Sequence, residues 1–123
     1  MSGASHLKPP SLREEVTWLA AAAVAGRAFG VRPAEIINCQ GRRTRAVGRL
    51  LEARRAAVYL AAVGGDLGSR ALMRATGLDQ NTVRPIKRAI EDSRELKAEL
   101  DALLDDMTAQ MQMALRSAGA VAA

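Results

Sequence analysis

The sequence predicts a compact all-α domain of five to six helices that ends in an amphipathic helix. Apolar residues make up 49% of the 123 residues, which is enough to fill a core. Most of them are Ala, Leu, Val and Met, and Ala and Leu have high helix propensities. The chain contains one Trp, one Tyr and one Phe. This scarcity argues against a β-sandwich, because strands favour aromatic and β-branched residues.

The first element expected is a flexible arm over residues 1–10, which are mostly small or polar and end in two prolines. Ser11 and Glu14 have the spacing of a capping box, so we expect a helix from residue 11 to about residue 28. Gly30 is placed to end it. The residues expected on its buried face are Leu12, Val16, Leu19, Ala23 and Trp18.

The next segment combines a short helix, a basic loop and a long helix. Pro33 fits the first turn of a short helix that contains Ile36 and Ile37. Residues 40–45 read QGRRTR and predict a basic loop. Residues 47–63 predict a long helix, which the following glycines end. The residues at helical spacing on one of its faces are Leu50, Leu51, Arg54, Ala57, Val58 and Ala61.

Two further helices are expected around a glycine. Ser69 is the expected N-cap of a short helix, and Gly77 suits the left-handed residue that ends it. Proline is harmless only in the first turn of a helix, and Pro85 belongs to the second of these helices. Either that helix begins near Thr82, with residues 79–81 in the turn, or it is kinked at the proline, and we favour the late start.

The last part of the chain predicts an amphipathic helical extension over residues 96–116, which follows a domain spanning residues 11–95. Residues 117–123 are small and predict a frayed tail. The apolar stripe of the extension has two interpretations: it packs on its own domain, or it contacts a protein partner or a second copy of the chain. Under the second interpretation the interface residues are Leu100, Leu104, Met107 and Met111.

Charge is distributed unevenly along the chain. The formal net charge is +5, yet residues 42–88 carry eleven basic and three acidic side chains, a net charge of +8. Residues 89–123 are acidic, with a net charge of −4. A concentrated positive field makes nucleic acid the first partner to consider.

Other classes of function find little support. The chain has a single cysteine, Cys39, and a single histidine, His6, which cannot supply the four ligands of a zinc site. No nucleophile sits with a partner base, so we expect no enzyme and no cofactor. No apolar run approaches the length of a membrane span. These observations favour a cytoplasmic, nucleoid-associated protein.

Residues 68–88 predict a helix-turn-helix, in which a short helix, a tight turn and a second helix with polar first residues follow one another. Asn and Gln can form two hydrogen bonds with adenine, and Asp can accept one from cytosine. By itself this pattern is equally typical of an ordinary helical bundle. The residues predicted to read bases are Asp79, Gln80, Asn81 and Thr82.

The order of these parts resembles the C-terminal DNA-binding domain of the bacterial replication initiator DnaA, over residues 12–96. The matching stretches are VAGRAFGVRPAEI, GRRTRAV, ARRAAVYLA, GSRALMRATGLDQNTV and IKRAIEDSREL. In the most specific stretch the family reads GGRDHTTV and this chain reads TGLDQNTV, so Gln80 and Asn81 replace two base-reading residues of the family. The resemblance implies binding to double-stranded DNA at a sequence other than the initiator's own.

The resemblance also implies a type of protein. The chain has no GxxxxGK[ST] phosphate loop and no room for a nucleotide-hydrolysing domain, so a stand-alone relative is expected. It is similar to gene transfer agent activators, which work with a sigma-factor-like protein and RNA polymerase. We expect a transcriptional regulator. The alternative is a protein-interaction adaptor that kept the fold without DNA binding.

The basic residues are expected to contact phosphates, and the resemblance leaves open whether Arg49 or Arg54 enters the minor groove. The full set predicted to contact the DNA backbone or minor groove is Arg42, Arg43, Arg45, Arg49, Arg54, Ser69, Arg84, Lys87 and Arg88.

Overall fold

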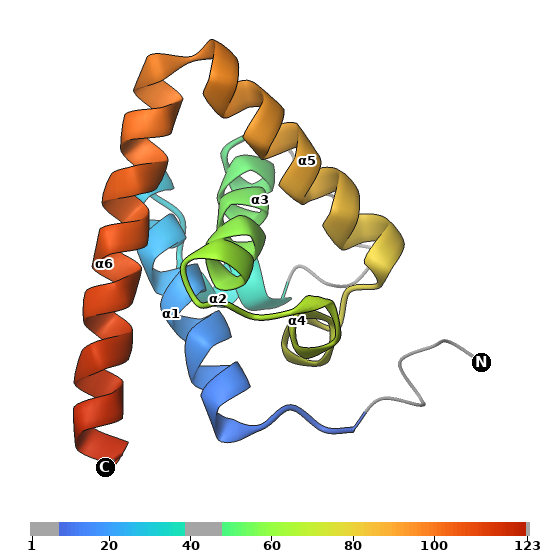
Figure 1. The fold of residues 1–123 in the computed structure, drawn as a ribbon, viewed down its shortest axis with the longest axis vertical. Coiled ribbons are helices and arrows are strands. Elements are labelled where there is room, and N and C mark those ends of the chain that lie inside the picture. Colours follow the sequence, from blue (N-terminus) through green and yellow to red (C-terminus); the bar gives the residue numbers. More distant parts are fainter. Residues whose placement is uncertain (1–7, 39–47, 123) are drawn as a thin grey trace.

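The computed structural model describes residues 8–38 and 48–122, with side chains as far as residue 119. All regular secondary structure in these ranges is α-helical, which confirms the all-α class (Figure 1). The elements are α1 (Leu12–Phe29), α2 (Pro33–Asn38), α3 (Gly48–Val63), α4 (Ser69–Thr76), α5 (Gln80–Leu96) and α6 (Ala98–Ala122).

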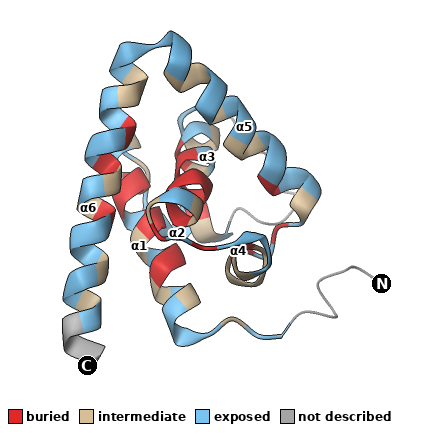
Figure 2. Ribbon diagram, in the orientation of Figure 1, coloured by how far each residue is buried: buried red, intermediate tan, exposed pale blue. Residues whose placement is uncertain are grey.

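Helix α3 lies at the centre and packs against each of the other five helices. Its residues from Ala56 to Ala61 are all buried, because neighbours surround it on every side (Figure 2). α1 and α6 lie side by side on one side of the molecule, and α5 crosses the other side (Figure 1). α5 and α6 meet at a sharp bend at Lys97, whose backbone is extended.

The buried face of α1 differs from the predicted one. Leu12 and Leu19 are 72% and 53% exposed, and Ala23 is also exposed, so the prediction that they are buried is wrong. Trp18 is buried, as expected. Because apolar residues surround this helix on nearly all sides, their spacing does not determine which face packs on α3. The residues that do form the buried face are Thr17, Trp18, Ala21, Ala22, Val24, Ala25 and Gly26.

The helix ends predicted from local sequence are largely confirmed. Ser11 Oγ accepts a hydrogen bond from the Glu14 N–H at 3.2 Å, and Glu14 Oε1 accepts one from the Ser11 N–H at 3.0 Å. Gly30 and Gly77 end their helices with φ values of 68° and 76°. Pro33 is the first residue of α2. Each of these helix ends depends on only a few consecutive residues, and for that reason each can be predicted from the sequence.

Two helix boundaries require correction. The N-cap of α4 is Gly68, not Ser69, and it makes no side-chain cap hydrogen bond. α6 continues to Ala122 and so includes residues 117–122, which were expected to fray. Three of those six residues are alanine, the best helix former.

The apolar stripe of α6 packs on its own domain. Leu104, Met107 and Met111 are at most 1% exposed, and α6 contacts α1, α3 and α5. Leu100 is half-buried against the same core. The interpretation of this stripe as a partner interface is therefore wrong, because its central side chains are already covered.

Arg94 fastens the α5–α6 bend to α3. Its Nε donates a hydrogen bond to Asp101 Oδ1 at 2.7 Å, and its Nη1 donates one to the Tyr59 hydroxyl at 3.1 Å. Its Nη2 donates to Asp105. Burial opposes the charged form, but the hydrogen bonds to Asp101, Tyr59 and Asp105 outweigh it and raise the Arg94 pKa. One arginine thus joins three helices.

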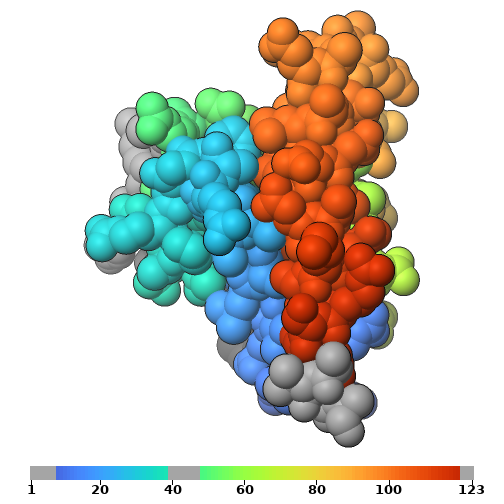
Figure 3. Space-filling model, turned by 90° about the vertical axis from the view of Figure 1, so that its left-hand side faces the viewer, coloured from blue at the N-terminus to red at the C-terminus, as the bar shows by residue number. Residues whose placement is uncertain are grey.

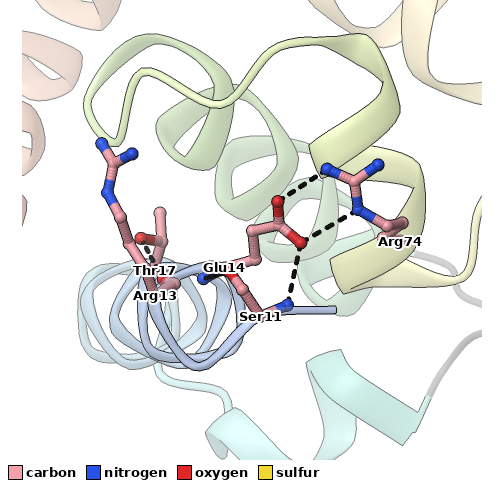
Figure 4. A network of polar contacts seen from close by, with 5 residues as sticks. All are labelled: Ser11, Arg13, Glu14, Thr17 and Arg74. Carbon is pink, nitrogen blue, oxygen red and sulfur yellow. Dashed lines mark hydrogen bonds and ion pairs between the residues drawn. The ribbon is translucent and has the colours of Figure 1, made fainter. Parts of the chain in front are cut away.

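Glu14 and Arg74 join the beginning of α1 to α4 (Figure 4). Arg74 donates to both carboxylate oxygens, from Nε to Oε1 at 3.1 Å and from Nη2 to Oε2 at 2.7 Å. The hydrogen bonds from Arg74 and, next, from the Ser11 N–H lower the pKa of Glu14 from 4.5 to about 2. The pair holds α4 against α1, although its two side chains are sixty residues apart in the chain.

We expect Glu14→Gln to destabilise the protein at neutral pH, and the deficit to shrink as the pH falls. The Glu14 pKa is 4.5 in an unperturbed chain and about 2 in the fold, so its contribution is complete above pH 4.5 and is lost as the pH falls towards 2. Urea unfolding of both proteins across this range measures the difference. Glu15→Gln, an exposed neighbour, controls for the lost charge. A deficit that stayed constant down to pH 2 would contradict the role of ionised Glu14.

Candidate nucleic-acid interface

The candidate site is built on α4, α5 and the three residues that link them. Gly77, in the left-handed conformation, donates its N–H to the Met73 carbonyl at 2.9 Å. The Thr76 hydroxyl donates to the Leu72 carbonyl at 2.7 Å and accepts from the Leu78 N–H at 3.1 Å. Leu72, Thr76 and Leu78 are all buried. These hydrogen bonds and buried side chains fix the conformation of the link, and so they fix the position at which α5 begins.

Asp79 is the N-cap of α5. Its Oδ1 accepts hydrogen bonds from the Thr82 N–H at 3.0 Å and from the Thr82 hydroxyl at 3.1 Å. Its carbonyl accepts from the Val83 N–H at 3.1 Å. α5 is an unbroken helix from Gln80, so the predicted start near Thr82 is wrong.

Pro85 is the sixth residue of α5 and lies inside the helix. Its missing N–H removes the hydrogen bond that the Asn81 carbonyl would otherwise accept. Asn81 is exposed, so water can bond to this carbonyl and limit the cost. The Asp79 cap secures the first turn, and a single unmade bond at an exposed position does not displace it.

α5 has a buried face and an opposite outward face. Val83 is buried, and Ile86 and Ile90 pack against the same core. The side chains exposed on the opposite side are separated by three and four residues, which places them on one face of the helix. This outward face consists of Asn81, Arg84, Pro85 and Arg88.

The four residues predicted to read bases have different surroundings. Asp79 and Thr82 are hydrogen-bonded to each other. With its oxygen directed at Arg84, the Gln80 amide accepts from Nε at 3.1 Å and Nη2 at 2.7 Å. Asn81 is exposed, and its side chain bonds to no residue in the described ranges. Of the four, Asn81 is the one whose side chain makes no hydrogen bond within the described ranges, so its whole amide is free for a ligand.

The cations of α5 that make no ion pair in the described ranges lie in its first half, whereas Arg94 near its end bonds to Asp101 and Asp105. Arg84 and Arg88 are exposed and Lys87 is half-buried. Beyond them the exposed charged side chains of α5 are acidic, at Glu91, Asp92 and Glu95. The helix therefore presents a positive half, next to α4, and a negative half, next to α6.

The remaining predicted contacts lie on other elements. Ser69 is exposed at the first position of α4, and Arg70, which the sequence analysis did not single out, is exposed beside it. Arg49, at the start of α3, reaches Gly30 at the end of α1. Arg54 is half-buried and takes part in a further interaction. The predicted contacts Arg42, Arg43 and Arg45 lie outside the described residues.

Two arginines have structural partners that the sequence analysis did not foresee. Arg74 bonds to Glu14 and Arg94 bonds to Asp101 and Asp105. Arg74 and Glu14 are sixty residues apart, so no local sequence pattern predicts that they pair.

Comparisons with protein-family models, curated proteins and solved structures find no match to this chain. The resemblance to the DnaA domain therefore stays a prediction that depends on the residues quoted above. In the described ranges, no helix is long and apolar enough to cross a membrane. Those ranges also contain no group of three or more His, Cys, Asp or Glu side chains that could hold a metal ion.

Proposed function

We propose that α4 and α5 form a helix-turn-helix that binds double-stranded DNA with sequence preference, and that the chain is a transcriptional regulator. The observation that carries this proposal is the outward face of α5, where the free amide of Asn81 lies beside Arg84 and Arg88. An amide among cations on an exposed helix suits a ligand that offers both base edges and phosphates.

The geometry of α5 suits the major groove. That groove admits an α-helix, and recognition helices contact base edges with their N-terminal residues. Asn81 is the second residue of α5, and its side chain can form two hydrogen bonds with adenine N6 and N7. Lys87 and Arg88 follow within two turns, where they can neutralise phosphates. The basic residues of segment 40–45 would add to this footprint.

The frame behind α5 supports a role in recognition. α4 is fastened to α1 through Arg74, and the far end of α5 is fastened to α3 and α6 through Arg94. A recognition helix discriminates between sequences only if its side chains are held in place, and rigid elements hold them better than loops. α5 is fixed at both of its ends.

The acidic half of α5 limits where DNA can lie. Glu91, Asp92 and Glu95 are exposed, and they would repel a phosphate backbone that continued along the helix. Within α5, the proposed contact is therefore confined to the first half of the helix. The resemblance adds a sigma-factor-like protein and RNA polymerase as partners within this proposal.

A salt titration of DNA binding tests the proposal. We expect the protein to bind a short fluorescent duplex with an affinity that falls steeply with salt, because cations on the protein release counterions from DNA. Arg88→Ala should reduce the slope of log affinity against log salt by about one. Fluorescence anisotropy measures both quantities.

Arg116→Ala is the matched control. It removes the same charge from an exposed position in the last third of α6. The C-terminal end of α6 lies far from the start of α5 (Figure 1). An equal effect of both substitutions would assign the slope to net charge and remove Arg88 from the footprint. If the wild-type protein bound no duplex at low salt, the proposal would fail and the adaptor role would replace it. Mapping of bound genomic sites then tests regulation.

A further inference from the structure

The contact between Gln80 and Arg84 suggests a specific reader of guanine. The two residues are one turn apart on α5, and with its oxygen directed at Arg84 the Gln80 amide accepts from Nε at 3.1 Å and from Nη2 at 2.7 Å, which is the one amide orientation in which the two side chains bond. We propose that Arg84 reads a guanine in the major groove and that Gln80 positions its guanidinium for this purpose. This inference rests on the proposed function.

The guanidinium of Arg84 is planar and carries five N–H groups in a rigid fork. Gln80 occupies the edge formed by Nε and Nη2. One N–H of Nη1 and the second N–H of Nη2 remain at the end of the fork, and they point in parallel away from Gln80. No residue in the described ranges bonds to this end.

The free end matches guanine. Guanine presents two acceptors, O6 and N7, on its major-groove edge, and a bidentate arginine is the commonest specific contact to it. A phosphate can also accept two N–H groups from an arginine, but charge alone is enough to neutralise it, whereas distinguishing guanine from the other bases requires the fork to be held in one plane. A hydrogen-bond partner such as Gln80, which fixes the plane of the guanidinium, is therefore more useful for reading a base than for binding a phosphate.

The neighbours on the outward face are consistent with this assignment. Arg84 lies on the same face as Asn81 and Pro85, so a guanine below Arg84 would lie close to the bases below those two side chains. Asn81 suits adenine, and the apolar ring of Pro85 can contact a thymine methyl group. The expected site therefore places a guanine next to an A·T pair.

This assignment exchanges the two roles predicted from sequence. There Arg84 was expected to contact phosphate and Gln80 to read a base. The amide oxygen of Gln80 is already engaged by Arg84, while the reading end of Arg84 is free. Gln80 is thus a positioning residue and Arg84 is the residue that touches the base.

The test uses a binding site selected by the wild-type protein from a randomised duplex pool. Each guanine of the selected site is then replaced by 7-deazaguanine, which keeps base pairing but lacks the N7 acceptor. We expect one guanine at which this replacement weakens wild-type binding about tenfold or more. Arg84→Ala should bind the two duplexes equally, because it has lost the group that senses N7.

Two variants of Gln80 test whether this residue positions the Arg84 guanidinium. Gln80→Ala should reduce discrimination at that guanine several-fold, by a larger factor than it reduces affinity for random duplex. Gln80→Glu keeps an acceptor for Arg84 and should retain the discrimination. Equal melting temperatures of these variants would show that a change in fold does not cause the effect. Discrimination that Gln80→Ala left intact would overturn the positioning role.

The remaining outcomes distinguish this inference from the proposed function. A selected site without a sensitive guanine, or an Arg84→Ala variant that still senses 7-deazaguanine, would overturn the inference while DNA binding stands. Equal losses by Arg84→Ala on selected and random duplexes would make Arg84 a phosphate contact and also overturn it. Failure of the wild-type protein to bind any duplex at low salt would instead refute the proposed function itself.

Discussion

Gly65→Ala is expected to lower the free energy of unfolding by about 3 kcal/mol, because the added methyl group has no space. A Cβ at this position would collide with Thr17 Cγ2 and would lie 2.8 Å from the Ala61 carbonyl oxygen and 3.2 Å from Met111 Cε. The Thr17 side chain is 1% exposed and its hydroxyl is bonded to the Arg13 carbonyl at 2.7 Å. The Met111 methyl can shift, but Thr17 and the backbone cannot yield cheaply.

Gly119→Ala makes the same chemical change where space is open. No atom lies within 4 Å of a Cβ at Gly119, which is inside α6. Alanine is the better helix former by up to about 1 kcal/mol, so this variant should be slightly more stable than the wild type. Urea unfolding of the two variants compares them directly. If Gly65→Ala were as stable as Gly119→Ala, the close packing described at Gly65 would be incorrect.

The glycines after α3 illustrate what local sequence does and does not reveal. Gly64 and Gly65 were predicted to end the long helix, and α3 does end at Val63. Their second role is packing, since a Cβ at Gly64 would lie 3.4 Å from Met111 Cγ on α6. That role depends on a residue almost fifty positions away, so it could not be inferred from a turn pattern.

In the rest of the fold, too, features set by a few neighbouring residues could be predicted, and features set by packing between distant residues could not. The capping box at Ser11, the first-turn proline at position 33 and the left-handed glycine at position 77 act within a few residues, and each was predicted correctly. The buried face of α1 was not, because a helix rich in alanine offers several apolar faces and only packing on α3 selects one. Leu19 illustrates this, since it is 53% exposed despite its apolar side chain.

The candidate site was predicted in outline but not in detail. The sequence placed polar residues at the start of α5 and cations after them. It could not show that Asp79 and Thr82 bond to each other or that Gln80 holds Arg84. Any of these side chains can equally bond to its neighbours or to a base, and only coordinates decide between the two. Pro85 misled the prediction because the Asp79 cap compensates for its missing N–H.

Met111→Ala is expected to lower the free energy of unfolding by about 3 kcal/mol, as truncations of fully buried methionines do. Met111 is 0% exposed and lies where α6 covers the glycines after α3. Met113, two residues further along the same helix, is 63% exposed, so Met113→Ala should change stability by no more than about 0.5 kcal/mol. The pair removes the same atoms from opposite sides of α6 (Figure 3 shows the face of the molecule on which α6 lies beside α1).

Comparing two spectroscopic signals of unfolding tests whether α6 unfolds together with the rest of the domain. Trp18, the single tryptophan of the chain, lies on α1 and is buried, so its fluorescence reports on the packing of the core. If α6 unfolds together with the core, Met111→Ala shifts the fluorescence and circular-dichroism transitions equally. If α6 were an arm that detaches alone, circular dichroism would change first and the Trp18 transition would stay where it is in the wild type. Because α6 packs against α1, α3 and α5, we expect a single shared transition.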